Sequence, residues 1–259
     1  MAFSYGITLL IICPLVFLAG FVDSIAGGGG LITLPAYILA GLPVHTAYGT
    51  NKFASTFGTG VSVFNYSRSK KVHFPAAMSG VLGALPGSWF GTQLALSLSP
   101  RTLLICMMVI LPLVAIFVFV NKGITEEIRP EPALKRLLII SFFTGLVIGA
   151  YDGFFGPGTG MFITLVLTGL AHLELVKAAG TTRVINFASN ISALIVWLIG
   201  GKILFSVALP AMACSIGGNF FGSRLAIKNG KKIIRPIILV VSGLLLIRVI
   251  SDFISLTAG

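Results

Sequence analysis

The sequence predicts an all-α, polytopic helical membrane protein made of two inverted-topology repeats, and three observations lead to this fold class. The 259 residues are 56% hydrophobic and only 10% charged, with a mean hydropathy of +1.03. A soluble domain is about 45–50% apolar and about 25% charged, so composition excludes a soluble protein. Apolar runs that approach or cross a core of about 30 Å recur along the chain. They lack the period-2 alternation of barrel strands.

The third observation is an internal repeat. A shift of 131 residues places Gly49-Thr50-Asn51-Lys52 on Gly180-Thr181-Thr182-Arg183, and a shift of 129 places Asp23 and Gly27 on Asp152 and Gly156. The 131-residue shift also aligns small and apolar residues of the two halves, namely Gly87, Phe90, Gly91, Leu94 and Ala95 with Gly218, Phe221, Gly222, Leu225 and Ala226. We therefore expect a first membrane repeat at 1–120, a charged cytoplasmic linker at 121–136 and a second, inverted repeat at 137–259.

Each half is expected to open with an apolar stretch that an aspartate and glycines break, followed by a short helix that is re-entrant. These pairs of segments are 3–22 with 31–41 and 137–151 with 161–171. The second segment of each pair, about eleven residues long, is too short to cross a bilayer alone. Three transmembrane helices complete each half, near 47–66, 75–98 and 102–120, and near 178–199, 204–227 and 236–256.

The basic residues decide between two topologies. If each broken opening is one interrupted helix, the Lys and Arg count on the two sides is an uninformative 8 against 6. If it is a hairpin that enters and returns, the halves are inverted, only Arg101 and Lys202 lie outside, and four cations lie within spans. The other twelve then lie inside: Arg68, Lys70, Lys71, Lys122, Arg129, Lys135, Arg136, Lys177, Lys228, Lys231, Lys232 and Arg235. Since cytoplasmic loops are rich in Lys and Arg, we expect inverted halves with both termini outside.

Glycine-interrupted segments at matching places in two inverted halves indicate the binding site of a secondary transporter. Each break begins a short helix, whose free N–H groups and dipole attract an anion. Six backbone positions are therefore expected to donate to substrate: Gly28, Gly29, Gly30, Gly158, Thr159 and Gly160. The alternative is that the glycines serve only a tight turn and close helix packing.

Lys52 and Arg183 are repeat mates inside long apolar helices. A cation at membrane depth costs at least about 2.5–3.5 kcal/mol, so it is expected to face a cavity, a partner or a substrate. Two such cations near two helix N-termini suit a small anion. Alternatively, Asp23 pairs one cation and Asp152 the other as structural salt bridges. The two interpretations are compatible, because an acid that releases its cation on protonation can couple proton and anion movement.

Polar residues near these cations complete the expected substrate-binding set, which is Thr50, Asn51, Thr181, Thr182, Asn186 and Asn190. Ser55 and Thr59 follow Lys52 at the same spacing at which Asn186 and Asn190 follow Arg183. Interhelical hydrogen bonding is the alternative role for each of them. Arg224 is expected to snorkel, and Arg248 to pair with Asp252 near the outer surface.

Other functions find little support in the sequence. The net charge of +11 would suggest nucleic acid for a soluble protein, but most cations fall in short loops between apolar runs. No catalytic triad, HExxH motif or Cys/His metal spacing is present, so we expect no enzyme, metal or cofactor. Cys13, Cys106 and Cys214 are expected to be free, buried thiols.

The stretches GFVDSIAGGGGLITLPA and GTNK in the first half, and AYDGFFGPGTG, TTRVINFASN and GGKI in the second, resemble the sulfite exporter TauE/SafE family of membrane transporters, especially its YfcA-like branch. The resemblance covers nearly the whole chain. It implies transport of small sulfur-containing anions, such as sulfite or organosulfonates, across the bacterial inner membrane. Arg183 stands where the family pattern leads us to expect Lys, which preserves charge but alters hydrogen-bond geometry.

The sequence leaves two rival functions open: a passive anion channel built on the same halves, and a membrane structural or assembly protein whose buried charges are only salt bridges. A homo-oligomer is equally open, since the apolar outer faces suit lipid or another subunit.

Overall fold

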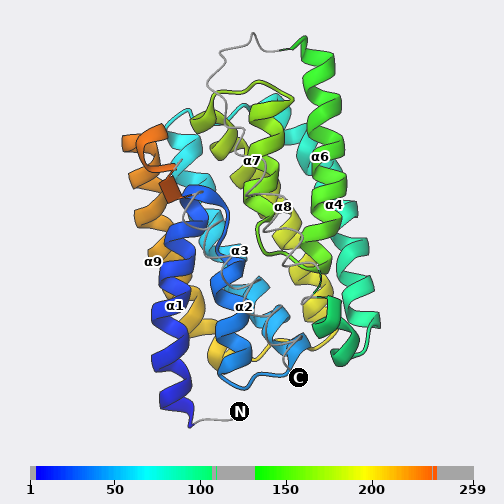
Figure 1. Cartoon of the computed structure of the whole chain (residues 1–259), viewed down its shortest axis with the longest axis vertical. Coiled ribbons are helices and arrows are strands. Elements are labelled where there is room, and N and C mark those ends of the chain that lie inside the picture. Colours follow the sequence, from blue (N-terminus) through cyan, green and yellow to red (C-terminus); the bar gives the residue numbers. More distant parts are fainter. Residues whose placement is uncertain (1–3, 107–108, 110–131, 235, 238–259) are drawn as a thin grey trace, which may run out of the picture.

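The computed structural model describes residues 4–106, 109, 132–234 and 236–237, and this part of the chain is helical without strands (Figure 1). The first half supplies α1 (Tyr5–Ala26), α2 (Gly30–Leu39), α3 (Val44–Arg68) and α4 (Phe74–Ser97). The second half supplies α6 (Leu134–Phe154), α7 (Thr159–Gly169), α8 (Leu175–Ile199) and α9 (Phe205–Asn229). The all-α prediction is confirmed.

Some expectations fall outside the described residues. These are most of the helices expected at 102–120 and 236–256, most of the linker at 121–136, and the pair of Arg248 with Asp252. The first helix of the second half begins at Leu134, three residues before the boundary predicted at 137. The three cysteines are free, as expected, but each is partly exposed and not buried.

The opening of each half is a helical hairpin. Tyr37 of α2 packs in the same apolar cluster as Ile12 of α1, so α2 returns beside the first part of α1. In the second half, Leu167 of α7 likewise packs in one cluster with Leu137 of α6. Left-handed glycines make the tips, including Gly27 with a φ of 85°, a conformation that costs a glycine little.

The helix ends differ from the predicted ones at these tips. α1 continues to Ala26 and α6 to Phe154, so Asp23 and Asp152 lie inside the last helical turns and not in the breaks. The Asp23 carboxylate accepts a hydrogen bond from the backbone N–H of Gly29 (3.2 Å), which ties the end of α1 to the beginning of α2.

Side-chain and backbone contacts give the helix directions. Along α3 and α9, Ser62 bonds to Asn219 and Asn65 to Ser223, so these two helices run the same way. Along α3 and α8 the pairing reverses, because Lys52 bonds to Asn190 while Tyr66 lies near Gly180. Contacts that advance together along both helices likewise show that α1 runs parallel to α9, and that α4 runs parallel to α6 and α8. Corresponding helices of the two halves therefore run in opposite directions.

The helices form two units that mix the two halves of the sequence. The first unit contains α1, α2, α3 and α9, and the second contains α4, α6, α7 and α8. In Figure 1, α1 and α9 lie on the left and α4 and α6 on the right. The main contact between the units runs along α3 and α8. We call this contact the unit interface.

Repeated glycines hold each unit together. A side chain at Gly87 or Gly91 of α4 would collide with the backbone of Leu146 or Ala150 in α6. Their repeat mates make the same contacts in the other unit, where a side chain at Gly218 or Gly222 of α9 would collide with the backbone of Phe17 or Phe21 in α1. Small residues allow such close backbone approach between membrane helices. The glycines that revealed the repeat thus join the fourth helix of one half to the first helix of the other.

Four described helices are long and apolar enough to cross a membrane by length and composition, namely α1, α6, α8 and α9. The helices α3 and α4 have similar lengths, 25 and 24 residues. In α3 the lower hydropathy has a clear cause, because the helix buries a row of polar side chains inside the bundle. That row positions the site described next.

Candidate functional site

A small polar cavity of about 40 Å³ lies between the two units at the level of the hairpin tips. We call it the central cavity. Its walls come from both hairpins and from α3, α8 and α9. At roughly 10–15 Å³ per water, the space would hold about three water molecules or one small ion.

Lys52 is the cationic side chain that lines this cavity. It lies on α3, two turns into the helix, and only 4% of the residue is exposed. Its Nζ donates to Oδ2 of Asp152 at 2.7 Å and to Oδ1 of Asn190 at 2.9 Å. Both partners belong to the second unit, so the ammonium group bridges the unit interface.

Asp152 is held by several donors at once. Besides Lys52, its carboxylate accepts from Thr159 Oγ1 at 2.9 Å and from Ser189 Oγ through a short hydrogen bond. The Thr159 hydroxyl belongs to the first turn of α7 and Ser189 to α8. This set of contacts joins the end of α6 to α3, α7 and α8.

Arg183 and Asp23 form the second ion pair across the unit interface, with Nη1 to Oδ2 at 2.9 Å. The Arg183 side chain is 1% exposed and the Asp23 side chain 19%. Arg183 does not line the cavity. Its guanidinium instead packs so closely on Gly160 that a side chain there would collide with it, and its Nε is buried without a hydrogen-bond partner among the described residues.

The structure brings together half of the predicted set around the cavity. The members that line it are Gly29, Gly30, Asn51, Lys52, Asn186, Asn190, Asp23 and Asp152. The members that do not are Arg183, Thr50, Thr181, Thr182, Gly28, Gly158, Thr159 and Gly160.

Two of the threonines that do not line the cavity have the same structural role. Thr50 Oγ1 accepts from the backbone N–H of Leu204, just before α9, and its mate Thr181 accepts from that of His73, just before α4. Each hydroxyl thus fixes the beginning of a helix. Thr182 is hydrogen-bonded to Thr164 of α7 at 2.9 Å. These contacts give the threonines positioning roles.

Sequence reasoning missed three polar residues of the cavity wall, Thr33, Ser215 and Asn219. Asn219 is an amide in the middle of an apolar helix and is 2% exposed, and that contrast is a signal that could have found it. Its neighbours in space, Gly20 of α1 and Ser62 of α3, come from distant parts of the sequence. Among the described residues no three His, Cys, Asp or Glu side chains come together to hold a metal ion.

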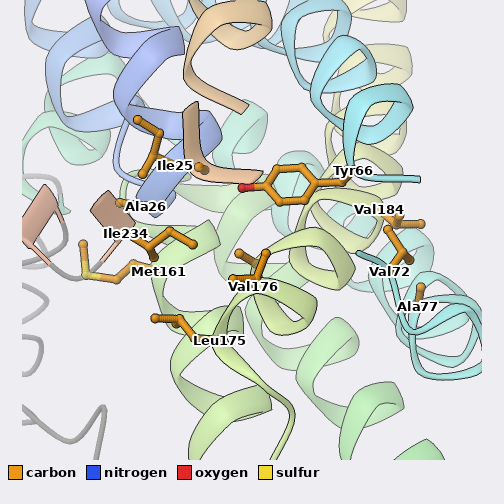
Figure 2. Close-up of a cluster of buried hydrophobic side chains, with 12 residues drawn as sticks. Ile25, Ala26, Tyr66, Val72, Ala77, Met161, Leu175, Val176, Val184 and Ile234 are labelled. Atoms are coloured by element: carbon orange, nitrogen blue, oxygen red, sulfur yellow. The ribbon is translucent and has the colours of Figure 1, made fainter. Parts of the chain in front are cut away.

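Two apolar clusters lie on either side of the cavity along the unit interface. One surrounds Tyr66 near the end of α3; Figure 2 shows this ring pointing toward the end of α1, where Ile25 and Ala26 lie. The other surrounds Tyr48 and Trp197 near the opposite end of α3. Their members are repeat mates: Ala26, Val44, Tyr48, Tyr66 and Ala95 map onto Phe155, Leu175, Ala179, Trp197 and Ala226.

Comparisons with known proteins agree with one another. A family model described as "Sulfite exporter TauE/SafE" matches residues 12–249. The chain is 38% identical to a "Probable membrane transporter protein ORF9" of Sinorhizobium sp. over 91% of its own length and 90% of the relative's. It is 34% identical to a probable membrane transporter protein of Haemophilus influenzae, with 95% and 96% covered. It is 32% identical to the probable membrane transporter protein YfcA of Escherichia coli, with 91% and 87% covered. No solved structure matches the chain significantly.

Proposed function

We propose, from the fact that this chain belongs to the sulfite exporter TauE/SafE family of multi-pass membrane proteins, that it is a secondary transporter for a small sulfur-containing anion. The substrate class is an anion such as sulfite or an organosulfonate, carried across the bacterial inner membrane. The observation that carries this proposal is the central cavity, where one buried ammonium group and several amides meet at the unit interface.

The cavity chemistry suits an oxyanion. Lys52 supplies the positive charge, and the side-chain amides of Asn51, Asn186 and Asn190 supply N–H groups. Gly30 at the beginning of α2 presents its backbone N–H group without an intervening side chain, whereas the N–H of Gly29 donates to Asp23 in the present state. An oxyanion of four or five heavy atoms is of the size this space admits, and larger substrates require it to widen.

Asp152 gives the site a means of coupling to protons. In the present state its negative charge occupies the ammonium group of Lys52. A proton on Asp152 removes that charge and releases Lys52 for an anion, so proton and anion would move together. Deprotonation restores the ion pair and expels the anion.

The two apolar clusters support an alternating-access mechanism. Each draws residues from both units, so each closes the unit interface on one side of the cavity. Because the clusters are repeat mates and corresponding helices run in opposite directions, opening one while closing the other exchanges the conformations of the two halves. With this arrangement we place both termini outside, the orientation that the basic loops favour.

The test is uptake of labelled sulfite and of a short organosulfonate by proteoliposomes, with and without a proton gradient. Lys52→Ala is compared with Arg183→Ala, since both remove a buried cation but only Lys52 lines the cavity. We expect gradient-dependent uptake that Lys52→Ala abolishes. Full uptake by both variants would show that the site is wrong, and uptake at high rates regardless of the gradient would identify a passive channel.

A binding assay accompanies the transport assay, because lost uptake alone does not separate binding from movement. An anion at 100 times its Kd stabilises the protein by about 2.7 kcal/mol, which appears as a higher melting temperature. We expect sulfite to raise the melting temperature of the wild type and of the Arg183→Ala variant, with no increase for Lys52→Ala. A sulfite response that survives in Lys52→Ala contradicts the proposed site.

A further inference from the structure

A second, larger hollow of about 750 Å³ lies on the outer surface between α3 and α9. We call it the outer groove. Its walls are apolar over most of their length, with Phe57 and Phe64 of α3 44% and 62% exposed. At one end the walls become basic through Arg68, Arg224 and Lys228.

The cations gather at one end because α3 and α9 run in parallel. Arg68 is the last residue of α3, and Arg224 and Lys228 lie in the last turns of α9. All three are exposed. Arg224 is held in place by Phe220, since its guanidinium carbon lies 3.8 Å from the centre of that ring.

The length of the groove matches one leaflet of a bilayer. From Phe57 to Arg68 the helix rises about 16 Å at 1.5 Å per residue, and half of a 30 Å hydrocarbon core is about 15 Å. The apolar end therefore lies near the middle of the bilayer when the basic end lies among the headgroups.

We propose that the outer groove binds an anionic phospholipid. The phosphate lies against Arg68, Arg224 and Lys228, and an acyl chain follows Phe64 and Phe57 toward the bilayer centre. Charge complementarity selects this occupant, because the described walls of the groove contain three cations and no acidic residue. Basic pockets between transmembrane helices bind anionic headgroups in this way.

The same charges oppose a second copy of the chain as the occupant. Two copies that met groove to groove about a two-fold axis would bring six cations together without a counter-charge from the described groove walls. A lipid phosphate neutralises them instead.

The outer groove and the central cavity share two helices. On α9, Ser215 and Asn219 face the cavity while Ile216 and Phe220 face the groove, and on α3 Thr59 faces the cavity while Gly60 faces the groove. A bound lipid thus contacts the outer side of the helices whose inner side forms the cavity wall.

The experiment is native mass spectrometry of the detergent-purified full chain, titrated with phosphatidylglycerol or with phosphatidylcholine of the same acyl chains. We expect phosphatidylglycerol to bind at least about tenfold more tightly. Each cation near a headgroup is worth about fivefold in affinity, so Arg68→Gln/Arg224→Gln should weaken phosphatidylglycerol binding about 25-fold. The matched control is Lys70→Gln/Lys231→Gln, which removes two exposed cations at the same end of these helices but outside the groove; we expect less than about a twofold change.

Several outcomes would overturn the proposal. Equal affinity for the two lipids removes the headgroup selectivity, and an equal loss in the control variant reduces the effect to general charge attraction. Competition by water-soluble glycerol 3-phosphate at the same concentration as the lipid shows a free-phosphate site. A dimer that forms at the expense of lipid binding shows that a second copy is the occupant. If the double arginine variant does not fold, Ile216→Trp narrows the apolar part of the groove and should weaken binding of phosphatidylglycerol at least about fivefold; unchanged binding would contradict the proposal.

Discussion

Neutralising Lys52 and Asp152 separately and together distinguishes a transport site from a structural salt bridge. The variants are Lys52→Met, Asp152→Asn and the two combined. Both side chains are almost completely buried, with 4% and 3% exposed, and their charged atoms are 2.7 Å apart. At an effective dielectric constant of about 20 this distance corresponds to an attraction of about 6 kcal/mol.

The single changes should be far more destabilising than the double change. Removing one partner leaves the other charge buried and unpaired, which costs about 3–5 kcal/mol of unfolding free energy. Together, the changes remove both charges, so neither partner leaves an unpaired charge buried. We therefore expect the double variant to lose only about 1–2 kcal/mol.

Stability is measured by denaturation in SDS and transport by sulfite uptake into proteoliposomes. The reasoning predicts a stable double variant that does not transport, because the anion has lost its cation. Wild-type uptake by that variant would refute the transport role and leave the pair as part of the scaffold. Additive losses of stability would refute the coupling between the two charges.

Other changes test separate parts of the structure. Asp23→Asn should lower the free energy of unfolding in SDS by about 1–2 kcal/mol less than Asp152→Asn does. The reason is that the Asp23 side chain is 19% exposed and partly solvated. Gly27→Ala should lower stability by about 2–4 kcal/mol, because its φ is 85° and the new methyl group meets the backbone of the other hairpin tip; Gly169→Ala, with open space around it, should leave the melting temperature unchanged. Ala19→Leu fills the central cavity and should abolish uptake, while lowering the free energy of unfolding by about 1–3 kcal/mol. Ala19→Ser, the matched control, should still transport. Uptake by the leucine variant would place the substrate elsewhere.

The sequence was sufficient for features that depend on local chemistry or on the repeat. The glycine breaks, the ranges of the described helices α1–α4 and α6–α9 to within a few residues and the positions of the four central charges all follow from composition and spacing. The alternative that Asp23 and Asp152 each pair a cation was also open from the sequence, and both pairs are present.

What the sequence did not supply depends on packing between distant segments. Lys52 and Arg183 are equivalent in the repeat, yet only Lys52 of the two lines the cavity, because the guanidinium of Arg183 packs against Gly160 of α7, in its own half of the chain. Asn219 joins the site because α9 packs between α1 and α3, and no local pattern in α9 identifies those neighbours.

The mixed composition of the two units has a consequence for how the protein is made. The first unit needs α9, near the end of the chain, before α1 and α3 gain their packing partner. During synthesis the amino-terminal hairpin is made long before α9, with which α1 packs. In the second unit, α4 is made before its partner α6. A chain cut between α4 and α6 would give two fragments that each lack a packing partner for their own helices, α9 for α1 and α3 in the first fragment and α4 for α6 and α8 in the second.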